Sequence, residues 1–175
     1  ATVYRLSWGN LDLPHAPGAL GVAVKIIVPP GSALSYWYID VSNRSKAWGI
    51  WQVRFPRLER LGPVGDPAED LFLDPMIQGR LTPNPYLGLL KASYVRDTPV
   101  QTAGQNVHYP GYASFQMCAL YHPDRAGLYY AAYDGKGYYK QFSFGPKEDG
   151  RSLDLYLQHS PEGQGLPGTG YVEGG

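Results

Sequence analysis

The sequence predicts an all-β fold, specifically an antiparallel β-sandwich with long proline-rich loops. The first observation is composition: Gly (22), Pro (16) and Tyr (15) are abundant among 175 residues, while charged residues make up only 17%. Turn-forming and aromatic residues in such numbers are typical of strands joined by turns. The second observation is a repeated alternation of apolar and polar residues between turn signals. Together these observations favour about eight to ten short strands.

Four strands are predicted in the first third of the chain from alternation and β-branched composition. The turn residues Pro29–Ser32 and the polar run Asn43–Ser45 separate them. Because Trp37 and Trp51 fall in the most regular patterns, we expect both side chains in the core. The four predicted strands are Thr2–Trp8, Leu20–Val28, Leu34–Ser42 and Trp48–Phe55.

The segment Leu61–Gly111 has a different pattern. It holds seven prolines and only short β-like pieces, such as Leu71–Leu73 and Ala92–Val95. Proline cannot donate to a sheet ladder, so we expect long loops and short edge strands here, and no helix. Long irregular loops on a β scaffold commonly carry function or interfaces.

Regular strands resume in the last third of the chain. Asp134–Gly137 reads Asp-Gly-Lys-Gly and predicts a hairpin turn, because Asp-Gly accommodates the positive φ that such turns need. The single cysteine, Cys118, lies inside a strand pattern and is expected to be a buried, inert thiol. The predicted strands are Ala113–Tyr121, Gly127–Tyr133, Tyr138–Phe144 and Arg151–Gln158.

The domain organisation is predicted from the change in composition after the last strand. Residues 1–158 are expected to form the sandwich. Residues 159–175 are rich in glycine and proline, so they are expected to be a connector toward a further domain that lies outside this sequence.

Charge and motifs exclude several classes of function. Lys+Arg and Asp+Glu both number 15, so no net field attracts nucleic acid or an anionic membrane. No apolar run is long enough for a membrane span, and one cysteine allows neither an internal disulfide nor a cysteine-based zinc site. Phosphate-loop, dinucleotide and nucleophile-elbow motifs are absent, so no catalytic residue, cofactor or metal ligand is predicted.

Two sets of titratable residues are candidates for a site. A pair of carboxylates could act as acid and base on a sugar, but nothing in the sequence pairs any two, and turn or cap roles are favoured. The histidines are scattered near turns, so ordinary hydrogen-bonded roles are favoured for them too. The carboxylates in loops are Asp66, Glu69, Asp70, Asp74, Asp97 and Asp134, and the histidines are His15, His108, His122 and His159.

Aromatic residues give the candidate binding site. Exposed aromatic rings stack on the apolar faces of sugars while neutral polar groups bind the hydroxyls. Four tyrosines flank the predicted hairpin and could form such a platform; the alternative is ordinary cross-strand packing. The candidate carbohydrate-binding residues are Tyr129, Tyr133, Tyr138 and Tyr139.

Several blocks of the chain, taken in order, carry a family resemblance that spans nearly the whole sequence. They are Ser7–Asp12, Pro30–Trp37, Val41–Asn43, Trp48–Pro56, Tyr109–Tyr121, Gly127–Asp134 and His159–Gly163. The series resembles the N-terminal β-sandwich, a galactose-mutarotase-like supersandwich, of uncharacterised bacterial proteins that look like glycoside hydrolases and continue into a (β/α)₈ barrel.

The resemblance implies a non-catalytic sandwich of a secreted or periplasmic bacterial protein. The barrel of the same polypeptide would carry the catalytic carboxylates, and the sandwich would dock on it and shape the substrate cleft. Two alternatives stay open: a free-standing carbohydrate-binding module, and a secreted structural or filament subunit that self-associates by strand exchange or edge pairing. The expected partners are therefore the barrel domain, a polysaccharide or a second copy.

Overall fold

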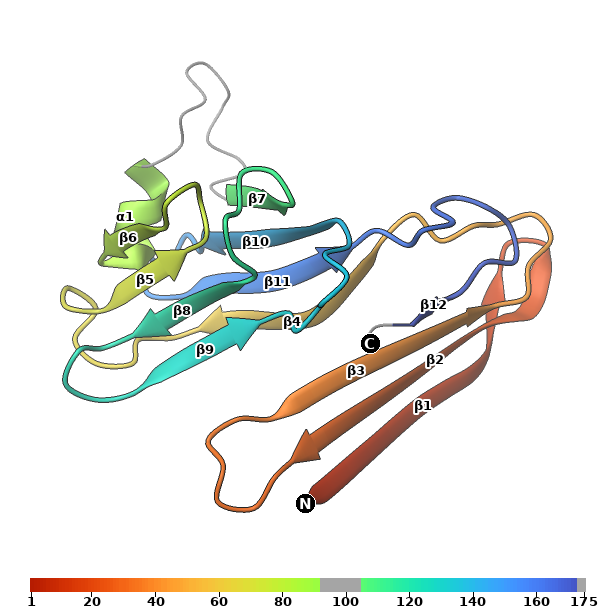
Figure 1. The fold of residues 1–175 in the computed structure, drawn as a ribbon, viewed down its shortest axis with the longest axis horizontal. Helices are drawn as coiled ribbons and strands as arrows, with labels where there is room; N and C mark the ends of the chain where they lie inside the picture. The colour runs from red at the N-terminus through yellow and green to blue at the C-terminus, as the bar shows by residue number, and fades with distance from the viewer. Residues whose placement is uncertain (92–104, 173–175) are drawn as a thin grey trace. The chain divides into compact units, whose positions relative to one another are not determined.

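The computed structural model describes residues 1–91 and 105–172 and is nearly all β, with antiparallel sheets (Figure 1). The all-β fold predicted from the sequence is confirmed. The chain divides into two compact units. Unit 1 comprises Ala1–Phe55 together with the described residues from 159 onward, and unit 2 comprises Pro56–Gln158.

Unit 1 contains a four-stranded sheet in the order β1-β2-β3-β12. Its long strands β1 and β2 pair in register from Thr2 opposite Val28 to Trp8 opposite Val22, beyond which the register shifts. The final strand, β12, pairs with β3 through Tyr171 opposite Val41. The strands are β1 (Thr2–Leu13), β2 (Ala16–Val28), β3 (Tyr36–Asn43) and β12 (Tyr171–Val172).

One face of this sheet is apolar. Directly opposed residues share a face, so the register places Tyr4, Leu6 and Trp8 of β1 beside valines and isoleucines of β2. The centre of the face packs with the chain that follows β3, in a cluster that includes Val24, Ile39, Val41 and Val53. The chain that follows β3 packs on side chains of β2 and β3, and the cluster includes no residue of β1. The β1 side chains on this face, Tyr4, Leu6 and Trp8, therefore stay 43–55% exposed.

Unit 2 is a β-sandwich of two four-stranded sheets. One sheet has the order β4-β11-β10-β7 and the other β6-β5-β8-β9. The first contains β4 (Val53–Leu61), β7 (Gln105–Tyr109), β10 (Lys140–Pro146) and β11 (Leu153–His159). The second contains β5 (Leu71–Asp74), β6 (Arg80–Pro83), β8 (Met117–Tyr121) and β9 (Gly127–Ala131).

The core of unit 2 joins the two sheets. Phe72 of β5 and Phe144 of β10 come from different sheets, and their ring centroids lie 4.8 Å apart. Alternation along β11 buries Leu153, Leu155 and Leu157 in the same cluster. The prediction that Cys118 is buried is confirmed, since the residue is fully enclosed in this core.

The proline-rich middle segment contains more structure than the sequence predicts. Here β5 is an internal strand rather than an edge strand, and α1 (Pro85–Lys91) is a short helix. The expectation of no helix was therefore wrong. Proline at the first helical position is preorganised for a helix and lacks only an N–H that would have no partner there. The predicted strand piece Ala92–Val95 lies outside the described residues.

The predicted hairpin at Asp134–Gly137 was also wrong. The strands on either side, β9 and β10, lie in different sheets, so the segment crosses from one sheet to the other. Glycine is still required in it, because Gly137 has φ of 69°. The local turn chemistry was recognised, but a turn motif does not determine which strands pair.

The predicted burial of Trp37 and Trp51 was wrong as well. Trp37 is 39% exposed and Trp51 is 67% exposed. Trp37 lies on the partly covered face of the unit 1 sheet, where it meets Phe55 at 6.1 Å between ring centroids. Trp51 precedes β4, which begins only at Val53, so strand alternation does not apply to it.

The glycine-rich end folds back on unit 1 over its described length. Gly165 donates its backbone N–H to the Ile50 carbonyl at 2.8 Å, and Pro167 forms an isolated bridge with Gly49. The assignment of residues 1–158 to one sandwich and of 159–175 to a connector stays a prediction, since neither the fold nor any contact described here tests it.

Candidate functional site: a braced loop that carries exposed tyrosines

The segment between β9 and β10, here called the Asp134 loop (residues 132–139), is organised by one carboxylate. Oδ1 of Asp134 accepts the backbone N–H groups of Lys136 at 2.9 Å and Gly137 at 3.2 Å. Its Oδ2 accepts the backbone N–H of Tyr138 at 2.7 Å. Aspartate commonly holds turns in this way, by binding backbone N–H groups a few residues ahead.

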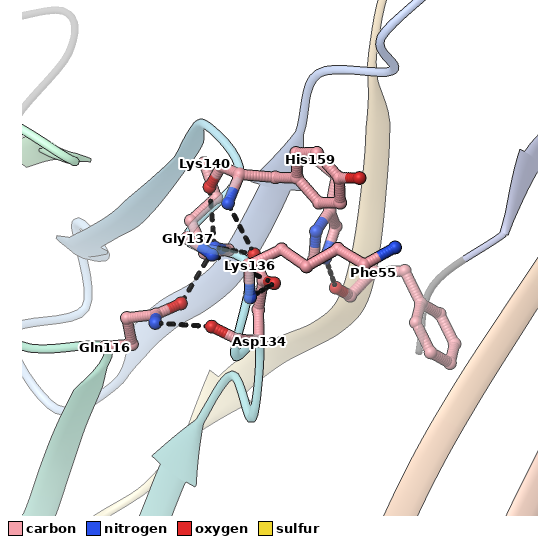
Figure 2. A network of polar contacts seen from close by, with 8 residues as sticks. Phe55, Gln116, Asp134, Lys136, Gly137, Lys140 and His159 are labelled. Atoms are coloured by element: carbon pink, nitrogen blue, oxygen red, sulfur yellow. Dashed lines mark hydrogen bonds and ion pairs between the residues drawn. The ribbon is translucent and has the colours of Figure 1, made fainter. Parts of the chain in front are cut away.

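A buried lysine completes the loop (Figure 2). Lys140 is only 2% exposed, and its Nζ donates to Asp134 Oδ2 at 2.6 Å, Gln116 Oε1 at 2.7 Å and the Tyr138 carbonyl at 2.6 Å. An ammonium has three N–H donors, and all three are used. Because a buried charge is costly unless it is fully paired, this network strongly favours a single loop geometry.

Gln116 connects the loop to the neighbouring chain. Its side-chain amide donates to the Asp134 carbonyl at 2.9 Å while its oxygen accepts from Lys140. Burial alone would raise the pKa of Asp134, but the hydrogen bonds from Lys140 and the backbone, with the charge of Lys140, hold that pKa below its ordinary value. The carboxylate is therefore ionised at neutral pH, and both of its oxygens accept hydrogen bonds from the loop or from Lys140.

All four candidate tyrosines are exposed. The exposed fractions are 44% for Tyr129, 67% for Tyr133, 42% for Tyr138 and 45% for Tyr139. Their hydroxyl groups and rings thus lie at the surface of unit 2, whereas the neighbouring Tyr130 is buried and donates its hydroxyl to the Pro56 carbonyl at 2.8 Å. All four candidate side chains are therefore accessible from solvent.

The structure brings two of the four tyrosines together. The hydroxyl oxygens of Tyr129 and Tyr133 lie 3.3 Å apart. The hydrogen bond to Tyr133, followed by burial, raises the pKa of Tyr129 to about 12. Tyr129 therefore stays un-ionised under physiological conditions, and its neutral hydroxyl lies next to two exposed rings.

The other two tyrosines have different neighbours. The ammonium of Lys136 lies 5.6 Å from the ring centroid of Tyr138, within range of a cation–π contact. Tyr139 contacts Nδ1 of His108 through its hydroxyl, and the two rings stack with centroids 5.5 Å apart. The tyrosines thus form one pair and two separately supported rings.

The loop carboxylates of unit 2 are engaged in structural contacts. Asp70 is fully buried and accepts the backbone N–H groups of Val64 and Gly65 and the hydroxyl of Tyr86. Burial raises the pKa of the Tyr86 hydroxyl, and the hydrogen bond to Asp70 and the negative charge of Asp70 raise it further. Asp70 therefore holds the chain before β5 in place.

Asp74 is also fully buried, and it forms an ion pair with Arg80 at 2.7 Å. Burial raises the pKa of Asp74, and the hydrogen bond and charge of Arg80 oppose that rise. Asp66 accepts the N–H of Ala68, a turn contact. The role favoured by the sequence, that these carboxylates stabilise turns and loops, agrees with the contacts of Asp66, Asp70, Asp74 and Asp134. Glu69 contacts His122 instead, and Asp97 lies outside the described residues.

Three of the histidines, His108, His122 and His159, have a partner at a ring nitrogen. Nε2 of His122 lies 3.2 Å from Glu69 Oε2, and Nε2 of His159 lies 2.9 Å from the Phe55 carbonyl oxygen (Figure 2). His15 has a positive φ of 60°, as expected in a turn. Within residues 1–91 and 105–172, no three His, Cys, Asp or Glu side chains gather as metal ligands would.

Lys140 is the residue that sequence reasoning missed. The signal was present: in the predicted strand Tyr138–Phe144, strict alternation places Lys140 on the same face as Phe142 and Phe144, both of which are buried. A lysine at a core position requires a partner. That partner had to come from the adjacent loop, and Asp134 was the nearest carboxylate in sequence.

In comparisons with known proteins, no family model, curated protein or solved structure matches the chain. Over the described part of the chain, no helix has the length and apolar character needed to cross a membrane.

Proposed function

We propose that this chain is a non-catalytic β module of a secreted carbohydrate-active protein, in which it contacts glycan through the tyrosines of the Asp134 loop and adjoining β9. In this proposal a barrel domain of the same polypeptide carries out the catalysis. The observation that carries the proposal is the exposure of Tyr129, Tyr133, Tyr138 and Tyr139 on and beside a loop that a buried lysine holds in place.

The chemistry of the tyrosines suits a neutral sugar. A phenol ring offers an apolar face to the C–H groups of a pyranose, and its hydroxyl both donates and accepts hydrogen bonds. Because Lys140 and Asp134 fix the loop, little conformational entropy is lost when a ligand binds. A preorganised surface that presents neutral phenol groups suits the apolar faces and hydroxyl groups of a glycan.

Two further observations support a non-catalytic module that docks. Asp70, Asp74 and Asp134 are occupied by structural hydrogen bonds rather than directed at an open site. In unit 1, Leu6 and Trp8 keep 43% and 48% of their surface exposed on an apolar sheet face. A contiguous exposed apolar face is typical of an interaction surface, as docking on a barrel requires.

The test is glycan binding by affinity electrophoresis in gels that contain soluble neutral polysaccharides. We expect retardation of the wild-type protein and clearly weaker retardation of the double variant Tyr129→Ala/Tyr133→Ala. The matched control is Tyr112→Ala, because Tyr112 is also in unit 2 and is 66% exposed. Equal retardation of all three proteins, or of none, would contradict glycan contact by these tyrosines.

A second candidate function, a self-assembling subunit, is favoured by β1. This strand lies at one end of the order β1-β2-β3-β12, spans Thr2–Leu13 and is exposed along nearly its whole length. Such an edge can pair with a strand of another copy. Light scattering across a range of concentrations tests it: assembly that Leu6→Lys abolishes would favour this function, and a monomer at high concentration would exclude it.

A further inference from the structure

A second exposed aromatic group lies in unit 1, at Trp51. Although the side chain is 67% exposed, its backbone is held on both sides. The Trp51 carbonyl accepts the side-chain amide N–H of Gln164 at 2.7 Å, and the neighbouring Ile50 carbonyl accepts the backbone N–H of Gly165 at 2.8 Å. The side chain is therefore displayed from a fixed position rather than from a free loop.

The indole of Trp51 packs closely against Gly165. A Cβ atom at Gly165 would lie 2.9 Å from both Cε2 and Cζ2 of the indole, and Gly165 has φ of +77°. Gly49 is equally constrained, because a Cβ there would lie 2.1 Å from the Gly165 carbonyl carbon. Two glycines thus allow the two segments to touch, and one side of the indole is supported while most of the ring stays open to solvent.

The segment before Trp51 is braced by hydrogen bonds. The Asn43 side-chain amide donates to the Trp48 carbonyl at 2.8 Å. The hydroxyl of Ser45 accepts the backbone N–H of Trp48 at 2.9 Å, and the indole N–H of Trp48 donates to the Pro14 carbonyl at 2.7 Å. This bracing preorganises the neighbouring Trp51 before any ligand arrives.

The surroundings of the ring determine which ligand it suits. Residues 47–53 and 163–172 contain no charged side chain, so a charged ligand finds no counter-charge in either segment. Gln164 uses one amide N–H on the Trp51 carbonyl, and an amide retains a second N–H and an oxygen for other partners. A supported aromatic face beside a neutral amide is suited to a flat, uncharged ring that bears hydroxyl groups.

We propose that the open face of Trp51 binds one pyranose ring of a neutral saccharide, whose hydroxyls hydrogen-bond the side-chain amide of Gln164. This site shares its ligand class with the proposed function but uses none of the residues of the Asp134 loop. Because the two sites share no residues, an experiment can refute one of the two proposals and leave the other standing.

The test is a titration of the ¹⁵N-labelled protein with neutral hexasaccharides of glucose, xylose, mannose and N-acetylglucosamine, followed by NMR. The chain has four tryptophans, so four indole N–H signals are expected, and single Trp→Phe variants assign them. We expect at least one hexasaccharide to shift the Trp51 signal and to leave the Trp8 signal in place. Trp51→Ala should raise the dissociation constant at least tenfold, and Trp51→Phe should raise it by a smaller factor.

The matched control is Tyr36→Ala, because Tyr36 is also an aromatic residue of unit 1 and is 37% exposed. This variant should bind as the wild-type protein does, and the dispersed signals of each variant report whether it is folded. The inference is overturned if no hexasaccharide moves the Trp51 signal, or if Trp51→Ala binds within twofold of wild type. Loss of binding in Tyr129→Ala/Tyr133→Ala alone would support the Asp134 loop and reject the Trp51 site.

Discussion

Replacement of Lys140 by methionine tests the central role of the buried lysine in unit 2. Methionine matches the length of the side chain but cannot donate, so three acceptors lose their partner: Asp134 Oδ2, Gln116 Oε1 and the Tyr138 carbonyl. A buried acceptor left unsatisfied costs about 1–3 kcal/mol. Because the Asp134 side chain is 21% exposed, water replaces part of what is lost. We expect unit 2 to lose about 3 kcal/mol, the lower end for a broken buried ion pair.

The two units carry separate probes for a urea unfolding assay. All four tryptophans lie at or before residue 51, within unit 1, whereas Cys118 lies in the core of unit 2. Accessibility of the Cys118 thiol to a disulfide reagent therefore reports the opening of unit 2. With a denaturant slope of about 1–3 kcal/mol per molar, a loss of 3 kcal/mol lowers the urea midpoint by about 1–3 M.

The matched variant is Asp134→Asn, which keeps the turn acceptor Oδ1 but removes the counter-charge of Lys140. The double variant should lose less than the sum of the single variants, because neither group is then left as an unpaired charge. A loss below about 1 kcal/mol for Lys140→Met, or strict additivity, would refute the argument that the network fixes the loop.

The same pair predicts a pH dependence. The pKa of Asp134 is lower in the folded protein than its unfolded value of about 3.9. The stabilisation is thus fully present above the unfolded pKa and is lost as pH falls through the folded pKa. The difference in stability between wild type and Asp134→Asn should shrink on acidification below about pH 4, and a constant difference down to pH 2 would contradict the assignment.

Three other predictions concern the cores and the close backbone contact. Burial raises the pKa of the Cys118 thiol, so it should stay unmodified by thiol reagents at pH 8 in the folded protein and react fully in urea. Gly49→Ala should lower stability by about 3 kcal/mol by overpacking against backbone, whereas Gly9→Ala, with open space at its Cβ, should have little effect on the melting temperature. Leu155→Ala, at a fully buried position, should cost about 2–5 kcal/mol in urea unfolding, against under about 1 kcal/mol for the 59%-exposed Leu166→Ala.

Local sequence patterns predicted most of the strands, because alternation directly reflects burial on one face. The segment Arg151–Gln158 is an example, since its leucines enter the unit 2 core as β11. Pairing was harder to predict. The turn residues of Asp134–Gly137 are satisfied both by a hairpin and by a crossing between sheets, and only long-range contacts decide between the two.

The four candidate tyrosines were selected because they flank a predicted hairpin, and their role in binding a glycan stays a prediction. The pairing of Tyr129 with Tyr133 depends on the three-dimensional path of the loop, which no local pattern encodes. Trp51 was misassigned because its pattern resembles a strand, while its true setting depends on Gly165, more than a hundred residues later. Contacts of that separation leave no local signal in the sequence.

The division of unit 1 into two separate stretches of chain affects the order of folding. During synthesis, Ala1–Phe55 emerges first but lacks β12 and the partner of Trp51, both of which follow Gln158. Unit 2 is continuous in sequence, so it can fold completely before the last strand of unit 1, β12, has been synthesised. Until then the edge of β3 that pairs with β12 has no partner strand, and an unpaired strand edge can pair with another chain. A pause in translation after residue 158 should therefore lengthen the period in which this protein is vulnerable to aggregation.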